Sequence, residues 1–79
     1  MKPHVRNYYK ALRYDISDFI ICELCGTIAV EIHHVTPRSL LGTDEINNLV
    51  ALCRECHDKA HGPMASVYKI KFKQIISKR

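Results

Sequence analysis

The sequence predicts one small α+β domain that needs a staple outside its apolar core. The chain has 79 residues, 47% hydrophobic and 25% charged, which is an ordinary globular balance in a length that suits one domain. A chain of this size buries only about 60% of the surface that its unfolded form exposes, so its core alone is marginal. Helical patterns at both ends flank three strand patterns, and four cysteines in two close pairs are the candidate staple.

Helical patterns lie at the two ends of the chain. Residues 4–14 contain no Gly or Pro, and their apolar side chains recur at helical spacing. These side chains are Val5, Tyr8, Tyr9 and Leu12. The tail after Pro63 fits a helix or, over a shorter stretch, an alternating strand. We favour the helix because the run is long and free of Gly and Pro.

The first half of the centre is expected to be extended. Residues 19–22 predict a short strand, and residues 27–35, rich in β-branched side chains, predict a second one that ends before Pro37. Between them Cys25 and Gly26 indicate a tight turn, since glycine adopts a positive φ without steric cost.

The second half of the centre returns to a strand and a helix. Residues 38–47 are expected to form a loop, and residues 49–53 a strand. Residues 54–61 predict a short helix, with Gly62 at the position after its end and Pro63 preventing its continuation.

Charge is distributed unevenly along the chain. The net charge of +4 divides into +2 for residues 1–19, −3 for residues 20–61 and +5 for residues 62–79. Basic ends suit a polyanion such as nucleic acid. They also suit a solvated lysine face that aids solubility, and charge alone favours neither interpretation.

The sequence gives no indication of a membrane. No apolar run approaches the roughly 18 residues that a span needs, and the start has no apolar signal-peptide core. We expect a soluble, cytosolic protein with no membrane partner. A reducing compartment favours metal thiolates over disulfides.

The cysteines have the spacing of a metal site. Cys22 and Cys25 form one C-x2-C pair and Cys53 and Cys56 another, with 27 residues between the pairs. Two intervening residues allow both sulfurs of a pair to face one ion, and four thiolates suit a closed tetrahedral site for one structural Zn²⁺. Redox dithiols and buried free thiols are the alternatives. No His lies twelve residues beyond either pair, which excludes a two-Cys, two-His finger.

The histidines indicate a second, open metal site. His57 and His61 are four residues apart on the expected helix, so their rings share one face. With one His of the His33-His34 pair they make a three-nitrogen site with open positions for water or substrate. The remaining His is a natural general base. Taken singly, each His has an ordinary structural explanation, such as a helix-end charge or a strand residue.

These residues together resemble the HNH endonucleases. The resemblance is to the ββα-metal (His-Me finger) fold in the variant with a four-cysteine zinc frame, and it covers residues 20–62. It implies one HNH domain over residues 1–79, with this core between basic segments 1–19 and 63–79. The residues that carry it are Cys22, Cys25, His33, His34, Asn48, Leu49, Cys53, Cys56, His57 and His61.

The resemblance implies a role for each polar residue of this set. His33, His57 and His61 match ligands of a catalytic metal, His34 matches the general base, and Asn48 matches the residue that tethers the loop carrying the base. Asn48 could instead be a plain turn residue. Strand alternation places Glu31 on the face of His33, where it could orient an imidazole or an Arg. Alternation also sends His33 and His34 to opposite faces, so the strand must twist or end nearby for both to serve one phosphate.

The resemblance implies metal-dependent hydrolysis of DNA phosphodiester bonds, and we expect a low-specificity nickase. Arg38 and Arg54 are candidate phosphate contacts or plain surface residues. Three imidazoles suit Mn²⁺, Ni²⁺, Co²⁺ or Zn²⁺ better than Mg²⁺. The size allows a homodimer or a subunit of a larger nuclease or packaging complex, in the cytoplasm of a bacterial or phage-infected cell. The alternative is a non-catalytic zinc module that binds nucleic acid, or a nuclease subunit that needs a partner.

Overall fold

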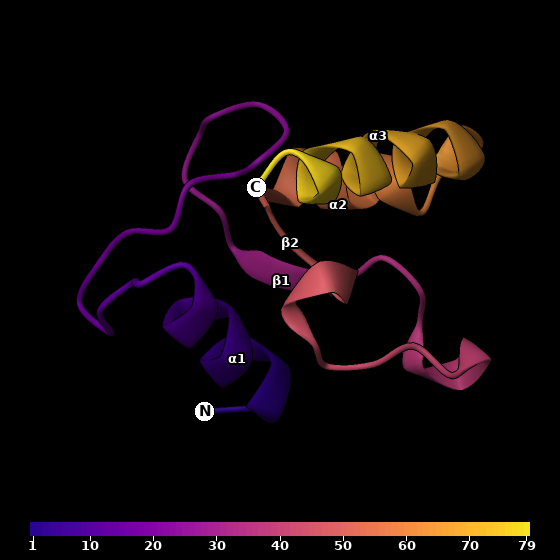
Figure 1. Ribbon diagram of the computed structural model, residues 1–79. Helices are drawn as coiled ribbons and strands as arrows, with labels where there is room; N and C mark the ends of the chain where they lie inside the picture. Colours follow the sequence, from indigo (N-terminus) through magenta and orange to yellow (C-terminus); the bar gives the residue numbers. More distant parts are fainter.

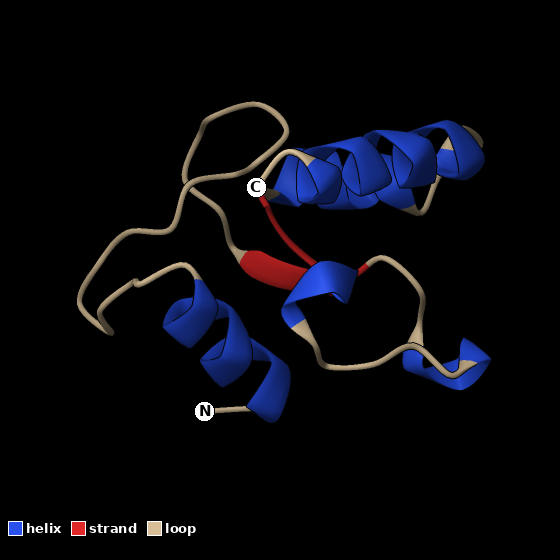
Figure 2. Ribbon diagram, viewed as in Figure 1, coloured by secondary structure: helices blue, strands red, loops and turns tan.

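Three helices surround a two-stranded sheet. The computed structural model describes all residues 1–79, drawn in Figures 1 and 2. Its elements are α1 (Pro3–Ala11), β1 (Glu31–His34), the 3-10 turns η1 (Arg38–Leu40) and η2 (Ile46–Asn48), β2 (Leu49–Leu52), α2 (Arg54–Ala60) and α3 (Ala65–Ser77). This arrangement confirms the predicted small α+β fold with helices at both ends. None of the helices has the length and apolar character needed to cross a membrane.

The sheet is covered on both faces, and α1 lies on the opposite side from α2 and α3 (Figure 1). β1 and β2 pair antiparallel, with Glu31 opposite Leu52 and His34 opposite Leu49. All four side chains of β2 are fully buried. They alternate between the two faces: Val50 and Leu52 pack beside the cysteines and Phe72 of α3, whereas Leu49 and Ala51 pack beside Tyr8 of α1. Because β2 is buried on both of its faces, all of its side chains are apolar and none alternates with a polar one.

Both flanking helices are tied to the core at one carboxylate, that of Glu23. The Tyr8 hydroxyl of α1 donates to Glu23 Oε2 at 2.9 Å, and the Arg79 guanidinium after α3 donates to the same oxygen at 2.5 Å. Burial, followed by the bond to Glu23, raises the pKa of Tyr8. Arg79 also donates to the carbonyl of Leu49 at 2.5 Å. The helices outside the cysteine and histidine motifs are therefore part of one packed unit.

The expected first strand is wrong, and the second is shorter than expected. Residues 19–22 contribute only an isolated bridge between Ile21 and Ile28, and of residues 27–35 only Glu31–His34 form a strand. The chain here bends around the first cysteine pair, where the N–H of Gly26 donates to the carbonyl of Cys22 at 2.9 Å. Gly26 has the predicted positive φ, 85°. The β-branched residues before Glu31 still pair, but mostly with residues 20–22 across the turn: the N–H of Ala29 donates to the carbonyl of Ile20 at 2.7 Å, and the N–H of Cys22 donates to that of Thr27 at 2.6 Å.

Other boundaries shift by a few residues. The first helix ends at Ala11 instead of residue 14, and Arg13 just beyond it has a left-handed φ of 60°. α2 ends at Ala60 with His61 as its cap, and Gly62 beyond it does not take the positive φ that its position suggested. The expected loop 38–47 contains η1 and the start of η2. The helical tail is confirmed as α3, which buries Phe72.

Candidate metal and active sites

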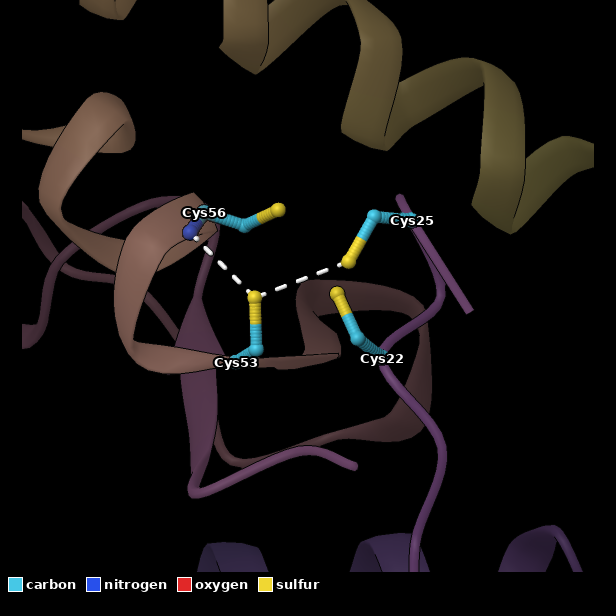
Figure 3. Close-up of side chains that lie close together, drawn as sticks. All are labelled: Cys22, Cys25, Cys53 and Cys56. Atoms are coloured by element: carbon cyan, nitrogen blue, oxygen red, sulfur yellow. Dashed lines mark hydrogen bonds between the residues drawn. The ribbon is translucent and has the colours of Figure 1, made fainter. Parts of the chain in front are cut away.

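The four cysteine side chains converge between the first turn of α2 and the turn that follows Ile21 (Figure 3). Their sulfur atoms all lie within 4.8 Å of one another, and the Sγ atoms of Cys25 and Cys53 are 3.6 Å apart. Cys22 and Cys56 are buried in the core beneath α3, whereas Cys25 is exposed. The pairing of the two C-x2-C motifs across 27 residues is therefore a property of the fold, as the spacing predicted.

The surroundings of the sulfurs favour thiolates at the exposed side of this group. Cys53 caps α2, and the backbone N–H of Cys56 lies 3.4 Å from its sulfur and lowers the pKa of Cys53 to about 6. Thr27, with its hydroxyl 3.0 Å from the sulfur of Cys25, lowers the pKa of Cys25. Burial raises the pKa of the Cys56 thiol. Four soft sulfur donors that close on one point fit a structural metal ion such as zinc, which would also ionise the buried thiol.

Three histidines meet on the same side of the sheet, nearer the end of α2. His33 of β1 and His57 and His61 of α2 place their ring nitrogens within 4.8 Å of one another. The Nε2 atoms of His57 and His61 are 3.2 Å apart. Two nitrogens at about 2.0–2.1 Å from one tetrahedral ion would be separated by roughly 3.3 Å. The donor type and this spacing fit a transition-metal ion.

Burial keeps His33 ready to act as a ligand. Burial, followed by the nearby rings of His57 and His61, lowers the pKa of His33 to about 4. His33 is therefore neutral at neutral pH, the form that binds a metal. Its ring also packs edge-on against Phe72, with centroids 5.5 Å apart, which orients it from the side of α3.

Glu31 reaches this histidine cluster, but not in the expected way. It lies on the same face as His33, and its Oε2 atom is 2.8 Å from Nε2 of His57. This is the nitrogen that also faces His61, so Glu31 does not orient the ring through its other nitrogen. In a metal-loaded site the carboxylate would have to share or leave this position.

His34 lies on the opposite face, as strict strand alternation requires. There its Nε2 atom is 2.8 Å from Oδ1 of Asp44, and its ring is 4.5 Å from that of His4 on α1. Arg38 donates to both oxygens of Asp44, at 3.2 and 2.6 Å. The bond to Arg38, followed by that to His34, lowers the pKa of Asp44. Arg38, a candidate phosphate contact, is thus occupied by a carboxylate of its own chain.

Asn48 is buried and fixes the loop that follows His34. Its Oδ1 atom accepts from the N–H of Thr36 at 2.8 Å, and its Nδ2 atom donates to the carbonyls of Thr36 and Thr43 at 3.0 and 2.8 Å. The loop folds back so tightly that a Cβ on Gly42 would lie 1.8 Å from the Thr36 carbonyl oxygen. Asn48 therefore does more than form a turn, because it joins both ends of this loop.

The two groups of histidines border one hollow of about 700 Å³, although they lie on opposite faces of β1. His33, His57 and His61 line it on one side and His34 and His4 on the other. β1 ends at His34, which is one of the two conditions expected for both groups to meet the same ligand, and residues of both faces line this hollow. Arg38 also lines it, whereas Arg54 is exposed at the start of α2 and does not.

Sequence reasoning missed Asp44 and His4 as members of this site. Asp44 lies ten residues from His34 in a loop, and His4 lies in a helix outside the resemblance. Neither has a spacing signal, because tertiary folding alone brings them to His34. The only local indication was that His4 is the one histidine apart from the four between residues 33 and 61.

Comparisons with known proteins agree with this geometry. The family model of HNH endonuclease matches residues 20–62, more than half of the chain. The chain is 43% identical over 51 residues to the type IV methyl-directed restriction enzyme EcoKMcrA of Escherichia coli K12, covering 52% of this chain and 18% of that enzyme. It is 45% identical over 38 residues to the probable mobile endonuclease C of Enterobacteria phage T4, covering 48% and 18%. The chain thus spans less than a fifth of the length of either relative. The match begins two residues before Cys22 and ends two residues beyond α2, so it includes all four cysteines and the histidines of β1 and α2, and the chain belongs to the HNH endonuclease family.

Proposed function

We propose that this chain is a metal-dependent endonuclease domain that hydrolyses DNA phosphodiester bonds. The observation that carries the proposal is the single hollow bordered by His33, His57 and His61 on one side and by His34 on the other. A cluster of metal-ligand nitrogens opposite a free imidazole offers both parts that hydrolysis of a phosphodiester needs.

His33, His57 and His61 would hold the catalytic ion in this proposal. An ion bound there supplies positive charge against the scissile phosphate and its leaving oxygen. The open side of the hollow leaves room for a phosphate, since only one face of the cluster is closed by Phe72. The ion is a transition metal such as Mn²⁺, Ni²⁺, Co²⁺ or Zn²⁺, because imidazole nitrogen suits these better than Mg²⁺.

His34 is the proposed general base, and Asp44 sets which of its nitrogens can act. Asp44 is held ionised by Arg38, and an ionised carboxylate only accepts hydrogen bonds. Nε2 of a neutral His34 must therefore carry the hydrogen that faces Asp44, which leaves the lone pair on Nδ1. Nδ1 would take the proton from the attacking water. Assistance of this kind contributes about 10²–10⁴-fold to the rate.

Binding to DNA would rely on charge beside the hollow. Lys69 of α3 lines a second hollow of about 350 Å³ that also contains His33, His34 and His61. Lys71, Lys73 and Lys78 continue the positive charge along α3, and no acidic residue follows residue 61. Phosphate contacts of this kind give affinity without sequence preference. One catalytic group per chain suits nicking of one strand at a time.

The test is relaxation of supercoiled plasmid by protein that keeps zinc in the cysteine group but has been stripped of any ion in the histidine cluster, with Mn²⁺, Ni²⁺, Co²⁺, Zn²⁺, Mg²⁺ or no ion then added. We expect ion-dependent nicking that falls by at least about 10²-fold in His34→Ala. Ser66→Ala, an exposed neighbour of the same region, is the matched control and should nick like the wild type. Folded protein that nicks with no ion, or a fully active His34→Ala, contradicts the proposal.

The second candidate is a zinc module that binds nucleic acid without cutting it. The observation in its favour is that the cysteine group and the basic α3 would serve nucleic-acid binding as well as they would serve cleavage. The same plasmid assay separates the two, because a binding module retards the plasmid on a gel without relaxing it.

A further inference from the structure

We propose that His4, His34 and Asp44 form a second site for a divalent transition-metal ion, on the α1 side of the sheet. The three residues come from α1, from β1 and from the loop before η2, and their ligand atoms lie within 4.8 Å of one another. All three are half-buried. Two imidazoles and one carboxylate are a donor set that zinc accepts, with a further position left for water.

His4 contributes the observation that is hardest to explain without a ligand. Its Nδ1 atom is buried and has no hydrogen-bond partner. Such atoms are rare in folded proteins because each loses its hydration without compensation. An ion held through Nδ1 would give this atom a partner.

Arg38 and Lys2 are the positive groups that act on this site, and Arg38, the one bonded to Asp44, can leave. Its guanidinium is bonded to Asp44, but the side chain is 62% exposed. An exposed ion pair contributes little to stability, so Arg38 can turn into solvent when an ion approaches the carboxylate. The nitrogen-rich set selects Zn²⁺, Co²⁺ or Ni²⁺ over Mg²⁺, which prefers an all-oxygen shell.

An ion in this site would disable the proposed general base. Nε2 of His34 faces Asp44, so it is the nitrogen that would bind the ion. A neutral imidazole bound to metal through Nε2 carries its hydrogen on Nδ1. The proton thus moves from Nε2 to Nδ1, and the lone pair that would accept the water proton is lost. Excess zinc therefore inhibits cleavage, a consequence that rests on the proposed function, whereas the site itself does not.

The site is tested by counting zinc bound to the full chain in equilibrium dialysis against buffered Zn²⁺. The wild type should hold three ions: one in the cysteine group, one in the histidine cluster and one here. His4→Ala and Asp44→Asn should each hold two, with zinc affinity at the lost site reduced more than about tenfold. Asn7→Ala is the matched control, since Asn7 also lies on α1 and donates to the Asp44 carbonyl, at 2.7 Å, without offering a ligand.

Side-chain NMR of the histidines gives a second readout that does not depend on the variants folding. Addition of the third equivalent of zinc to the wild type should shift the ring signals of His4 and His34. A wild type that saturates at two ions, or His4→Ala that holds as many as the wild type, overturns the proposal.

A plasmid assay tests the inhibitory consequence separately. With Mn²⁺ supporting cleavage, added zinc should inhibit the wild type at concentrations at least about tenfold lower than those that inhibit His4→Ala. Equal inhibition of both proteins overturns the consequence. If neither protein nicks the plasmid, the proposed function is overturned. The zinc count alone then decides whether this second metal site exists.

Discussion

The four-cysteine group and the histidine cluster use the two ends of the same helix, α2, in opposite ways. The cysteine group lies at the start of α2, with Cys22 and Cys56 inside the core. The histidine cluster lies at its end, with His57 half-buried and His61 exposed beside an open hollow. A closed group surrounded by core stabilises the fold, whereas an open one beside a hollow leaves positions for a ligand. The difference teaches that one short helix can present one candidate metal group to the core and another to an open hollow, because its first turn packs into the core and its last turn borders the hollow.

The largest effect on stability is expected from a substitution in the cysteine group at the start of α2. Cys56→Ser should abolish cooperative folding, because zinc in four-thiolate sites contributes about 10–16 kcal/mol in small peptides, as much as the whole stability of a domain. Circular dichroism and thermal unfolding of zinc-loaded protein measure this. A Cys56→Ser protein that unfolds with the midpoint of the wild type would show that the core alone suffices.

The matched change at the other end of α2 should spare the fold. His57→Ala removes a half-exposed ring, so we expect only a small change in unfolding temperature and a loss of cleavage of at least about 10²-fold. Asp58→Ala, the exposed next residue, is the control and should retain activity. The two measurements are a plasmid time course and a thermal melt of the same preparation. A His57→Ala protein that is unfolded would show that the histidine end of α2, like the cysteine end, is needed for folding.

A smaller effect is expected from Asn48, the buried residue that holds the loop after His34 in place. Asn48→Ala leaves the Thr36 N–H and the carbonyls of Thr36 and Thr43 without their partner, which should cost about 1–3 kcal/mol and loosen the loop after His34. Urea unfolding measures the free energy. Asn47→Ala, at the exposed neighbouring position, should change it by less than about 0.5 kcal/mol.

The smallest effect is a pH dependence that belongs to His33. Its pKa is about 4 in the fold and about 6.5 in an unfolded chain, so between these values the unfolded state binds more protons. Stability without an ion in the histidine cluster should therefore fall as the pH drops from about 6.5 toward 4. His33→Gln removes this contribution, so the difference in urea midpoint between wild type and His33→Gln should change across that window. A difference in urea midpoint that stays constant across this pH window would contradict the prediction.

Most of the fold was predictable because its signals are local. The helical tail needed only a long run without Gly or Pro, and β2 only a continuous apolar stretch, since both patterns follow from backbone geometry. The extended stretch from residue 27 was overestimated, because its first residues pair with residues 20–22 across the turn at Gly26 and only Glu31–His34 continue as a strand beside β2. The sequence pattern indicates which secondary structure a segment prefers. The backbone hydrogen-bond partners that are available decide how far the strand or helix extends.

The sequence by itself indicated the candidate ligand sets, because two C-x2-C pairs and two histidines four residues apart on a helix have spacings typical of metal ligands. Only the tertiary structure decided what surrounds them. It placed Asp44 and His4 beside His34, turned Arg38 toward Asp44, and brought Glu31 to the outer nitrogen of His57. These contacts join segments that are far apart in the chain or held by loops, and no periodicity records them, because they arise from packing α1 and the loop after β1 against each other on one side of a small sheet.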